Sequence, residues 1–291
     1  MNNKTKTILP VLALSLFISL TGPCRAQQVQ GTLANILETK TIKLGHLDQS
    51  IPFSFADEKG KPLGYSVELC LRVVAGIEQQ YGLPKLEVRW VPVTMANRFE
   101  MVANGSIDLE CGISTITMSR RKQVDFSLMT WVDGGSFVVK ANQPHGGVGD
   151  LAGKKIAVIA GTTTESALRE AMKKDFINAD LISVKDQLDG LSALDQGKVD
   201  AYAADQTVLI GLALAFKDQL AVKLSDRNFS FEPYGLALRR NDADFKQAVD
   251  QTLARLYRTG QIGPIYDRWF GKLGKPSALL WDSWAAYSRL S

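Results

Sequence analysis

A short stretch between residues 115 and 120 combines groups that could hold a carboxylate. Thr115 contributes a hydroxyl group, and Arg120 opens the basic triplet Arg120-Arg121-Lys122. A guanidinium group is a planar fork of N–H donors that matches the two oxygens of a carboxylate, and hydroxyl and backbone N–H groups can complete the coordination. The alternative is a polar turn with a solvated basic triplet. The triplet alone favours that alternative, so other parts of the chain must decide between the two.

Three further positions offer complementary groups. Thr163 lies between a predicted strand and a helix N-terminus, where free N–H groups and the helix dipole favour an anion. Asp205 ends an apolar run, where its carboxylate could accept an ammonium group or cap the next helix. Arg98 stands at the start of a short predicted helix. Together with Arg120 and Thr115, these residues would suit a zwitterion.

Metal and catalytic motifs are weak by comparison. His46 and His145 are the only histidines, and neither has a cysteine or carboxylate at the spacing of a zinc site. The sequence contains no P-loop signature and no serine in a Gly-x-Ser-x-Gly elbow. We therefore predict no metal, no cofactor and no catalytic residue.

Strand and helix patterns alternate twice along the chain. The first series of predicted elements lies at residues 41–47, 66–80, 86–93, 97–103 and 107–113. The second series lies at residues 155–159, 162–173, 181–184, 188–195 and 199–204. Each series is typical of an α/β layer with a mainly parallel sheet flanked by helices, so the sequence predicts two α/β lobes. Arg120 belongs to the first lobe, whereas Thr163 and Asp205 belong to the second.

Residues 1–26 are typical of a secretory signal peptide. Lys4 and Lys6 provide a positive segment, an apolar segment follows at 8–20, and a small-x-small cleavage site ends at Ala26. The apolar segment is shorter than the roughly 20 residues of a membrane-spanning helix. We therefore expect a periplasmic mature chain, cleaved near Ala26, without stable membrane insertion.

The composition is that of an ordinary globular protein, with 291 residues of which 45% are hydrophobic and 22% charged. Cleavage of the signal peptide would remove Lys4, Lys6 and Arg25 and bring the formal charge of +4 close to neutrality, which predicts no nucleic-acid partner. Export would leave Cys70 and Cys111 in a compartment where a disulfide is allowed. The sequence does not determine whether these two cysteines lie close enough to pair.

Several short pieces occur in a characteristic order and spacing over nearly the whole mature chain. They are Ile51-Pro52-Phe53-Ser54-Phe55, Gly64-Tyr65-Ser66, Asn97-Arg98, Gly105-Ser106-Ile107-Asp108-Leu109-Glu110-Cys111-Gly112, Arg120 with Lys122-Gln123, Gly161-Thr162-Thr163, Asp205, Tyr234-Gly235 and Asp267-Arg268-Trp269-Phe270. In these pieces the chain resembles the solute-binding proteins of polar amino-acid ABC transporters (bacterial solute-binding protein family 3), most closely the glutamate/aspartate-binding subfamily.

The resemblance implies a two-lobed periplasmic-binding-protein fold of type II. Lobe 1 would comprise residues 27–139 and 234–291, and lobe 2 residues 140–233, joined by two hinge strands near residues 139–140 and 231–233. Ligand binding would close the lobes, and the closed form would dock on a membrane permease. We expect the protein to be a monomer.

Carried over position by position, the resemblance also implies roles for the residues singled out above. Arg120 and Thr115 match the residues that hold the α-carboxylate of the ligand, and Thr163 matches a second-lobe hydroxyl that assists them. Asp205 matches the acid that takes the α-amino group. Arg98 matches an arginine that, in the acidic-amino-acid binders, reaches the side-chain carboxylate of the ligand.

The side-chain pocket departs from that subfamily. Leu47 stands where the acidic-amino-acid binders carry a second arginine, Met95 and Ile113 stand where they carry serines, and Gln187 stands where they carry histidine. Each unmade contact to a charged group costs on the order of 1.5–3 kcal/mol, so tight glutamate binding is not expected. Ser50 replaces the aromatic residue that many relatives stack over the ligand, so no such clamp is predicted. The apolar replacements favour a ligand with an apolar portion, and a neutral polar or smaller ligand is the alternative.

The sequence thus predicts an amino-acid-binding subunit of an ABC importer rather than an enzyme. One rival is a periplasmic cyclohexadienyl (prephenate/arogenate) dehydratase, because such enzymes resemble these binders. A dehydratase needs an acid that faces the pocket, and Glu110 is the nearest candidate. A second rival is a soluble ligand-sensing module. The identity of the ligand, the affinity and the role of the C-terminal tail stay open at this stage.

Overall fold

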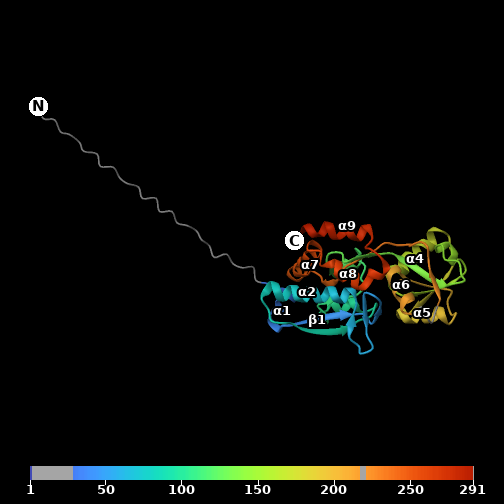
Figure 1. The fold of residues 1–291 in the computed structure, drawn as a ribbon, viewed down its shortest axis with the longest axis horizontal. Coiled ribbons are helices and arrows are strands. Elements are labelled where there is room, and N and C mark those ends of the chain that lie inside the picture. Colours follow the sequence, from blue (N-terminus) through green and yellow to red (C-terminus); the bar gives the residue numbers. More distant parts are fainter. Residues whose placement is uncertain (2–28, 217–220, 291) are drawn as a thin grey trace.

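A computed structural model describes Met1, residues 29–216 and residues 221–290 of the chain. The predicted signal peptide, residues 1–26, lies outside the described residues apart from Met1. Figure 1 shows two lobes side by side, one containing α1, α2, α7, α8 and α9 and the other containing α4, α5 and α6. Each lobe is built around a five-stranded sheet, so the predicted two-lobed α/β architecture is confirmed.

The first sheet combines strands from both ends of the described chain. In spatial order its strands are β5 (Glu87–Pro92), β1 (Thr41–His46), β6 (Leu109–Glu110), β15 (Ala237–Arg239) and β7 (Val124–Phe126). The strand β1 pairs in parallel with β5 and β6, whereas β15 runs antiparallel to β6 and β7. A small antiparallel sheet in this lobe contains β2 (Gln49–Ser50), β3 (Ser54–Ala56) and β4 (Pro62–Leu63).

Helices from both ends of the chain cover the first sheet, and the red C-terminal helices lie beside the blue and cyan N-terminal ones in Figure 1. They are α1 (Gly31–Thr39), α2 (Tyr65–Tyr81), α3 (Arg98–Ala103), α7 (Ala243–Arg258), α8 (Ile262–Phe270) and α9 (Ala278–Tyr287). The helices α2 and α7 approach closely at Gly76, where a Cβ atom would come within 2.2 Å of the Thr252 hydroxyl oxygen. The C-terminal segment is therefore an integral part of the first lobe.

The second sheet lies in the other lobe. Its strands, in spatial order, are β11 (Asp180–Val184), β10 (Lys155–Ile159), β12 (Ala201–Asp205), β9 (Gly135–Lys140) and β13 (Val222–Leu224). The helices of this lobe are α4 (Thr163–Lys174), α5 (Gln187–Asp195) and α6 (Gln206–Ala215). The parallel neighbours β11, β10 and β12 direct their carboxyl ends toward the same edge of the sheet, as the sequence pattern indicated for Asp205 and the loop before Thr163.

Two crossing strands join the lobes. The strand β8 (Trp131–Asp133) pairs with β14 (Glu232–Tyr234) in antiparallel register, with Asp133 opposite Glu232. The two residues of the first hinge predicted from the sequence, 139 and 140, lie within β9 of the second sheet. The second predicted hinge, near 231–233, overlaps β14. We propose that the first lobe boundary falls in β8 rather than between residues 139 and 140.

Local sequence signals explain the elements that carry the site. The side chain of Thr162 accepts a hydrogen bond of 3.1 Å from the backbone N–H of Glu165 and so caps α4, while the Glu165 carboxylate accepts from the N–H of Gly161 at 2.8 Å. The spacing Thr162-x-x-Glu165 is that of a capping box, although the Glu165 carboxylate reaches the N–H of the residue before the N-cap. In contrast, the strand predicted at 107–113 is regular only over Leu109–Glu110, and both of its residues are buried rather than alternating.

A disulfide links Cys70 of α2 to Cys111, directly after β6, with Cα atoms 6.1 Å apart. Both cysteines are fully buried. The crosslink ties the N-terminal helix layer to the central strand of the first sheet. It therefore holds the strand that leads into the hydroxyl-rich stretch containing Thr115.

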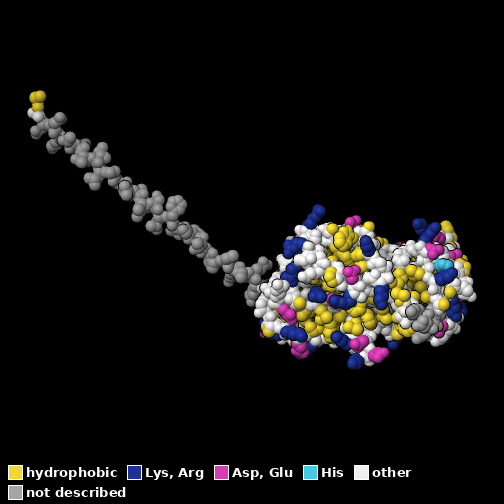
Figure 2. Space-filling model, in the orientation of Figure 1, with side chains coloured by type: hydrophobic (Ala, Val, Ile, Leu, Met, Phe, Trp, Pro, Cys, Tyr) yellow, Lys and Arg dark blue, Asp and Glu magenta, His cyan; other side chains and the backbone are white. Residues whose placement is uncertain are grey.

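The surface is mixed in charge. Figure 2 shows Lys and Arg side chains interspersed with Asp and Glu on the face in view. Within the described residues, no helix is both long enough and apolar enough to cross a bilayer.

Candidate functional site

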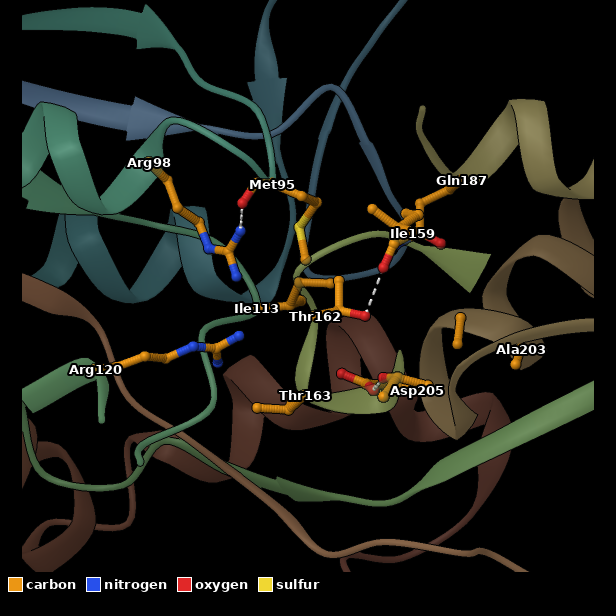
Figure 3. A pocket seen from close by; sticks show the side chains of 12 residues that line it. Met95, Arg98, Ile113, Arg120, Ile159, Thr162, Thr163, Gln187, Ala203 and Asp205 are labelled. Carbon is orange, nitrogen blue, oxygen red and sulfur yellow. Dashed lines mark hydrogen bonds between the residues drawn. The ribbon is translucent and has the colours of Figure 1, made fainter. Parts of the chain in front are cut away.

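A small cavity lies between the two lobes. Its walls come from both lobes, and Figure 3 shows their side chains converging on it. The lining residues are Met95, Arg98, Ile113, Arg120, Ile159, Thr162, Thr163, Thr164, Gln187, Ala203, Ala204 and Asp205. Most of the residues singled out from the sequence are therefore brought together. Of those predicted, Thr115 and Leu47 lie beside this lining rather than on it, within the part of the chain that the structure describes.

Arg120 enters the cavity from the short 3-10 helix η1 (Arg120–Lys122) (Figure 3). Its Nη1 donates a hydrogen bond of 2.9 Å to the carbonyl oxygen of Thr115, which orients the guanidinium group. Burial lowers the pKa of Arg120 from its usual value. The neighbouring Arg121 is exposed and pairs with Asp125 at 3.2 Å, so only the first arginine of the basic triplet faces the cavity.

Arg98 lies in the first turn of α3 and is only 1% exposed. Its Nε donates to the hydroxyl oxygen of Ser114 at 3.0 Å, and its Nη1 donates to the carbonyl oxygen of Met95. Burial lowers its pKa to about 10, while Glu110 acts in the opposite direction, so the guanidinium remains charged at neutral pH. Both Arg98 and Arg120 also lie over the ring of Phe99, at 4.4 and 5.0 Å from its centroid.

The helix α4 begins at the opposite wall, where Thr162, Thr163 and Thr164 line the cavity. Capping by Thr162 does not exclude anion binding here, because one side chain satisfies only one of the free N–H groups of the first turn. The hydroxyl oxygen of Thr163 lies 3.2 Å from that of Thr115 in the first lobe. This direct contact between the lobes shows that the structure has the closed arrangement.

Asp205 ends β12 at the N-cap position of α6, but within the described chain its side chain makes no capping hydrogen bond. Its carboxylate instead accepts hydrogen bonds from the hydroxyl groups of Thr164 and Tyr234. Burial, reinforced by the nearby Glu232 carboxylate, raises the pKa of Asp205 to about 6. The simple capping alternative is therefore wrong, and the carboxylate is held at the cavity by neutral donors.

Two further carboxylates near Asp205 were missed by the sequence reasoning. Asp133 in β8 accepts from the backbone N–H of Gly134 at 2.9 Å, and burial together with Asp205 raises its pKa to about 7. Glu232 in β14 accepts from the hydroxyl group of Thr115 at 2.7 Å. The signal available in the sequence was an acid in each of two short apolar segments, but nothing local indicated that the segments pair.

Three of the four specificity positions, Met95, Ile113 and Gln187, line the cavity. Gln187 is 4% exposed, and its side-chain oxygen accepts a hydrogen bond from the hydroxyl group of Tyr202. The remaining position, Leu47, is 4% exposed and lies on the wall of an adjacent hollow.

Glu110, the acid considered for a dehydratase, is not among the residues that line the cavity. Its side chain is fully buried, and neither carboxylate oxygen has a hydrogen-bond partner among the described residues. A Cβ on Gly112 would come within 2.1 Å of one of these oxygens, so the carboxylate lies against the backbone beneath the cavity. Its charge opposes that of Arg98. The described residues contain no group of three His, Cys, Asp or Glu side chains arranged to hold a metal ion.

Two α/β lobes that meet over a cavity with buried arginines and a buried carboxylate define a two-lobed solute-binding protein. The sequence model of the bacterial extracellular solute-binding proteins, family 3, matches residues 42–272, and the chain belongs to this family.

Named relatives agree with this assignment. The chain is 38% identical over 261 residues to the L-glutamate/L-aspartate-binding protein of Pseudomonas aeruginosa, covering 89% of this chain and 86% of the relative. It is 31% identical over 261 residues, with the same coverage, to the glutamate/aspartate import solute-binding protein of Escherichia coli (strain K12). Both relatives are named as binding proteins.

The fold is also similar to a solved structure, the ancestral amino acid-binding protein AncCDT-1, described as a precursor of cyclohexadienyl dehydratase. The TM-score is 0.71 at 28% identity, covering 82% of this chain and 100% of that chain. The similarity therefore includes a binding protein that preceded an enzyme on the same fold.

Proposed function

We propose that the protein is the periplasmic amino-acid-binding subunit of an ABC importer and delivers its ligand to a membrane permease. The observation that carries the proposal is the meeting of Arg120 and Asp205 in one closed cavity. The two groups carry opposite charges and come from different lobes, as recognition of an α-amino acid zwitterion requires.

The arrangement suggests a role for each group. Arg120 binds the α-carboxylate, assisted by the hydroxyl group of Thr163 and the N-terminal N–H groups of α4. Asp205 accepts hydrogen bonds from the α-ammonium group. The hydroxyl group of Thr115, already bonded to Glu232, contributes from the edge of the site.

Capture and closure follow from the division of the site between lobes. Arg120 stands ready in the first lobe, and rotation about β8 and β14 brings Thr163 and Asp205 onto the bound ligand. The ligand shifts the population toward the closed state because it contacts the second lobe only in that state. Contacts such as the 3.3 Å hydrogen bond from the backbone N–H of Leu188 to the side-chain oxygen of Gln49 then hold the lobes together.

An enzymatic role has weaker support. A dehydratase requires an acid positioned to protonate a leaving hydroxyl group. Glu110 lies buried beneath Arg98, and the carboxylate that does line the cavity, Asp205, is already assigned to an ammonium group. We therefore propose binding without catalysis.

Calorimetry across the twenty amino acids tests this function. We expect at least one α-amino acid to bind, and Arg120→Ala to weaken its binding about 100-fold, because a charge-assisted bidentate contact is lost. The matched control is Arg121→Ala, which removes an exposed arginine from the same turn and should leave the affinity unchanged. Undiminished binding by Arg120→Ala would overturn the carboxylate assignment, and the absence of binding to any α-amino acid would overturn the function.

A further inference from the structure

A second hollow adjoins the inner cavity and is also formed by both lobes. We call it the outer chamber; its walls are residues 47–50, 93–96, 159–160 and 184–187. It holds about 1180 Å³ of empty space, part of which is continuous with solvent, against about 350 Å³ for the inner cavity. Met95, Ile159 and Gln187 line both spaces and so form the boundary between them. A ligand that fills the inner cavity and extends past these residues enters the outer chamber.

The buried side chains that line the outer chamber are mostly apolar, with Ser50 and Gln187 as the polar exceptions. The side chains of Leu47, Val93, Ile159 and Val184 face it and are 4–9% exposed. The single cation among its lining residues, Lys185, has an exposed position at the rim. A second ligand carboxylate would therefore find no buried positive partner in this chamber, whereas methylene groups would replace water on its walls.

Arg98 is a poor substitute for that missing partner. Two of its nitrogen atoms already donate to Ser114 and to the carbonyl oxygen of Met95, and Glu110 opposes its charge from below. A side-chain carboxylate as short as that of glutamate would compete with these internal partners. The described cavity thus offers one well-disposed cation, Arg120, for one carboxylate.

The positions of the charged groups set the direction of the ligand. Arg120, Thr163 and Asp205 line the inner cavity but not the outer chamber, whereas Leu47 lines the outer chamber but not the inner cavity. An amino acid whose head group meets Arg120 and Asp205 therefore directs its side chain between Met95 and Gln187 toward Leu47. Methionine suits such a passage because its unbranched side chain adapts to irregular contacts.

We propose that the ligand is an α-amino acid whose side chain is longer than that of glutamate and apolar in its outer part, and that this part occupies the outer chamber. The inference rests on the proposed function, because it needs the head group to be held by Arg120 and Asp205. It deepens that function by naming the ligand class and by making Leu47, Val93 and Val184 specificity-determining residues.

Calorimetry with the wild-type protein and a series of straight-chain amino acids tests the length requirement directly. The probes are L-alanine, L-norvaline, L-norleucine and L-2-aminoheptanoate, with L-glutamate as the charged comparator. Burial of one methylene group is worth about 0.8 kcal/mol, so Kd should fall about fourfold for each added methylene that reaches the chamber. The two longest probes should also bind more tightly than glutamate.

The variant Val184→Thr tests the location, since it places a hydroxyl group on the chamber wall at nearly constant volume. The gain in affinity from norvaline to 2-aminoheptanoate should shrink at least threefold in this variant. Ile182→Thr introduces the same side chain at an exposed position of the same strand, and the gain should stay at the wild-type value.

The outcomes separate the inference from the function on which it rests. If glutamate binds more tightly than every straight-chain probe, or if Kd does not depend on chain length, the ligand-class inference is overturned while amino-acid binding stands. If Val184→Thr retains the full wild-type gain, the outer chamber is not where the side chain lies. If no α-amino acid binds, both proposals fail together.

Discussion

The two ends of the interlobe space are built on different principles. At the inner end, Arg120 and Asp205 are positioned by hydrogen bonds to Thr115, Thr164 and Tyr234. In the outer chamber, most of the buried wall is formed by the aliphatic side chains of Leu47, Val93, Ile159 and Val184. Hydrogen-bonded charges fix one geometry, so the inner end suits the invariant head group of amino acids. Burial against an apolar wall stabilises a ligand in proportion to the apolar area that is removed from water. The outer chamber can therefore select a ligand by the length of its side chain.

The comparison also shows how closure is linked to recognition. Asp205 belongs to the second sheet, yet its partner Tyr234 lies in the crossing strand β14. A hydrogen bond therefore links Asp205, for which we propose a role in head-group binding, directly to the crossing strand β14. The outer chamber is also bridged between the lobes, by the hydrogen bond from the backbone N–H of Leu188 to the side-chain oxygen of Gln49, but this bond involves no charged group.

The strongest test of the inner end is Asp205→Asn. The amide keeps the shape but loses the charge, so binding of the α-ammonium group should weaken about 10- to 150-fold, the equivalent of one hydrogen bond to a charged group. Calorimetry with the tightest ligand of the amino-acid panel measures the change. Asp180→Asn, an exposed change on β11 of the same lobe, serves as the control. An affinity within twofold of wild type would show that the ammonium group lies elsewhere.

The substitution Leu47→Arg should shift the ligand preference of the outer chamber from an apolar to a negatively charged side chain. The new guanidinium would lie beside the buried Glu110, because a Cβ on Gly112 would contact both Leu47 Cδ1, at 2.9 Å, and Glu110 Oε1, at 2.1 Å. We expect glutamate affinity to rise about tenfold and norleucine affinity to fall. Leu47→Met, which preserves the apolar wall, is the matched control. Circular dichroism confirms folding, and an unchanged ratio of the two affinities would contradict the apolar role of Leu47.

The affinity that comes from the head-group contact with Asp205 should depend on pH. The affinity that comes from side-chain contacts in the outer chamber should not. The pKa of Asp205 in the ligand-free closed form is raised to about 6, and a bound ammonium group favours its ionised form. Binding therefore releases a proton below pH 6, and affinity should fall as the pH falls, by about tenfold between pH 7 and pH 5. Calorimetry in buffers of different ionisation enthalpy measures the proton release. Asp205→Asn should flatten the profile, and an affinity that rises toward low pH would contradict the assignment.

The smallest expected effect is that of Thr115→Val. This nearly isosteric change removes the hydroxyl that donates to Glu232 and lies 3.2 Å from the hydroxyl of Thr163. Loss of about 1 kcal/mol should weaken binding about fivefold for short and long ligands alike. Fluorescence titration with alanine and norleucine measures both. A change confined to the longer ligand would place Thr115 at the outer end instead.

Much of the head-group site was predictable because its residues sit where regular elements end. Thr163 follows a β-strand and a helix cap, Asp205 ends an apolar strand, and Arg120 opens a basic turn. Periodicity and capping are local properties, so they identify such positions without knowledge of the fold. The resemblance to a binding-protein family then predicted that the residues meet.

Other parts of the site depend on contacts between distant segments. The residues of the first predicted hinge lie in β9, which reads as an ordinary strand, and only its pairing with β12 places it in the second sheet. Asp133 and Glu232 become neighbours only through the pairing of β8 with β14. The disulfide between Cys70 and Cys111 similarly requires that α2 pack against the end of β6.

The sequence by itself determined the two-lobed α/β architecture and the apolar character of Leu47, Met95 and Ile113, and it singled out Arg120, Thr163 and Asp205 as candidates for head-group binding. Only the tertiary structure decided that Asp205 is held by Tyr234 rather than used as a helix cap, and that Leu47 faces a separate outer chamber. The physical reason is that periodicity and side-chain chemistry are properties of short segments of the sequence. The partner of a buried polar group and the shape of an interlobe space depend on which distant surfaces the closed fold brings together.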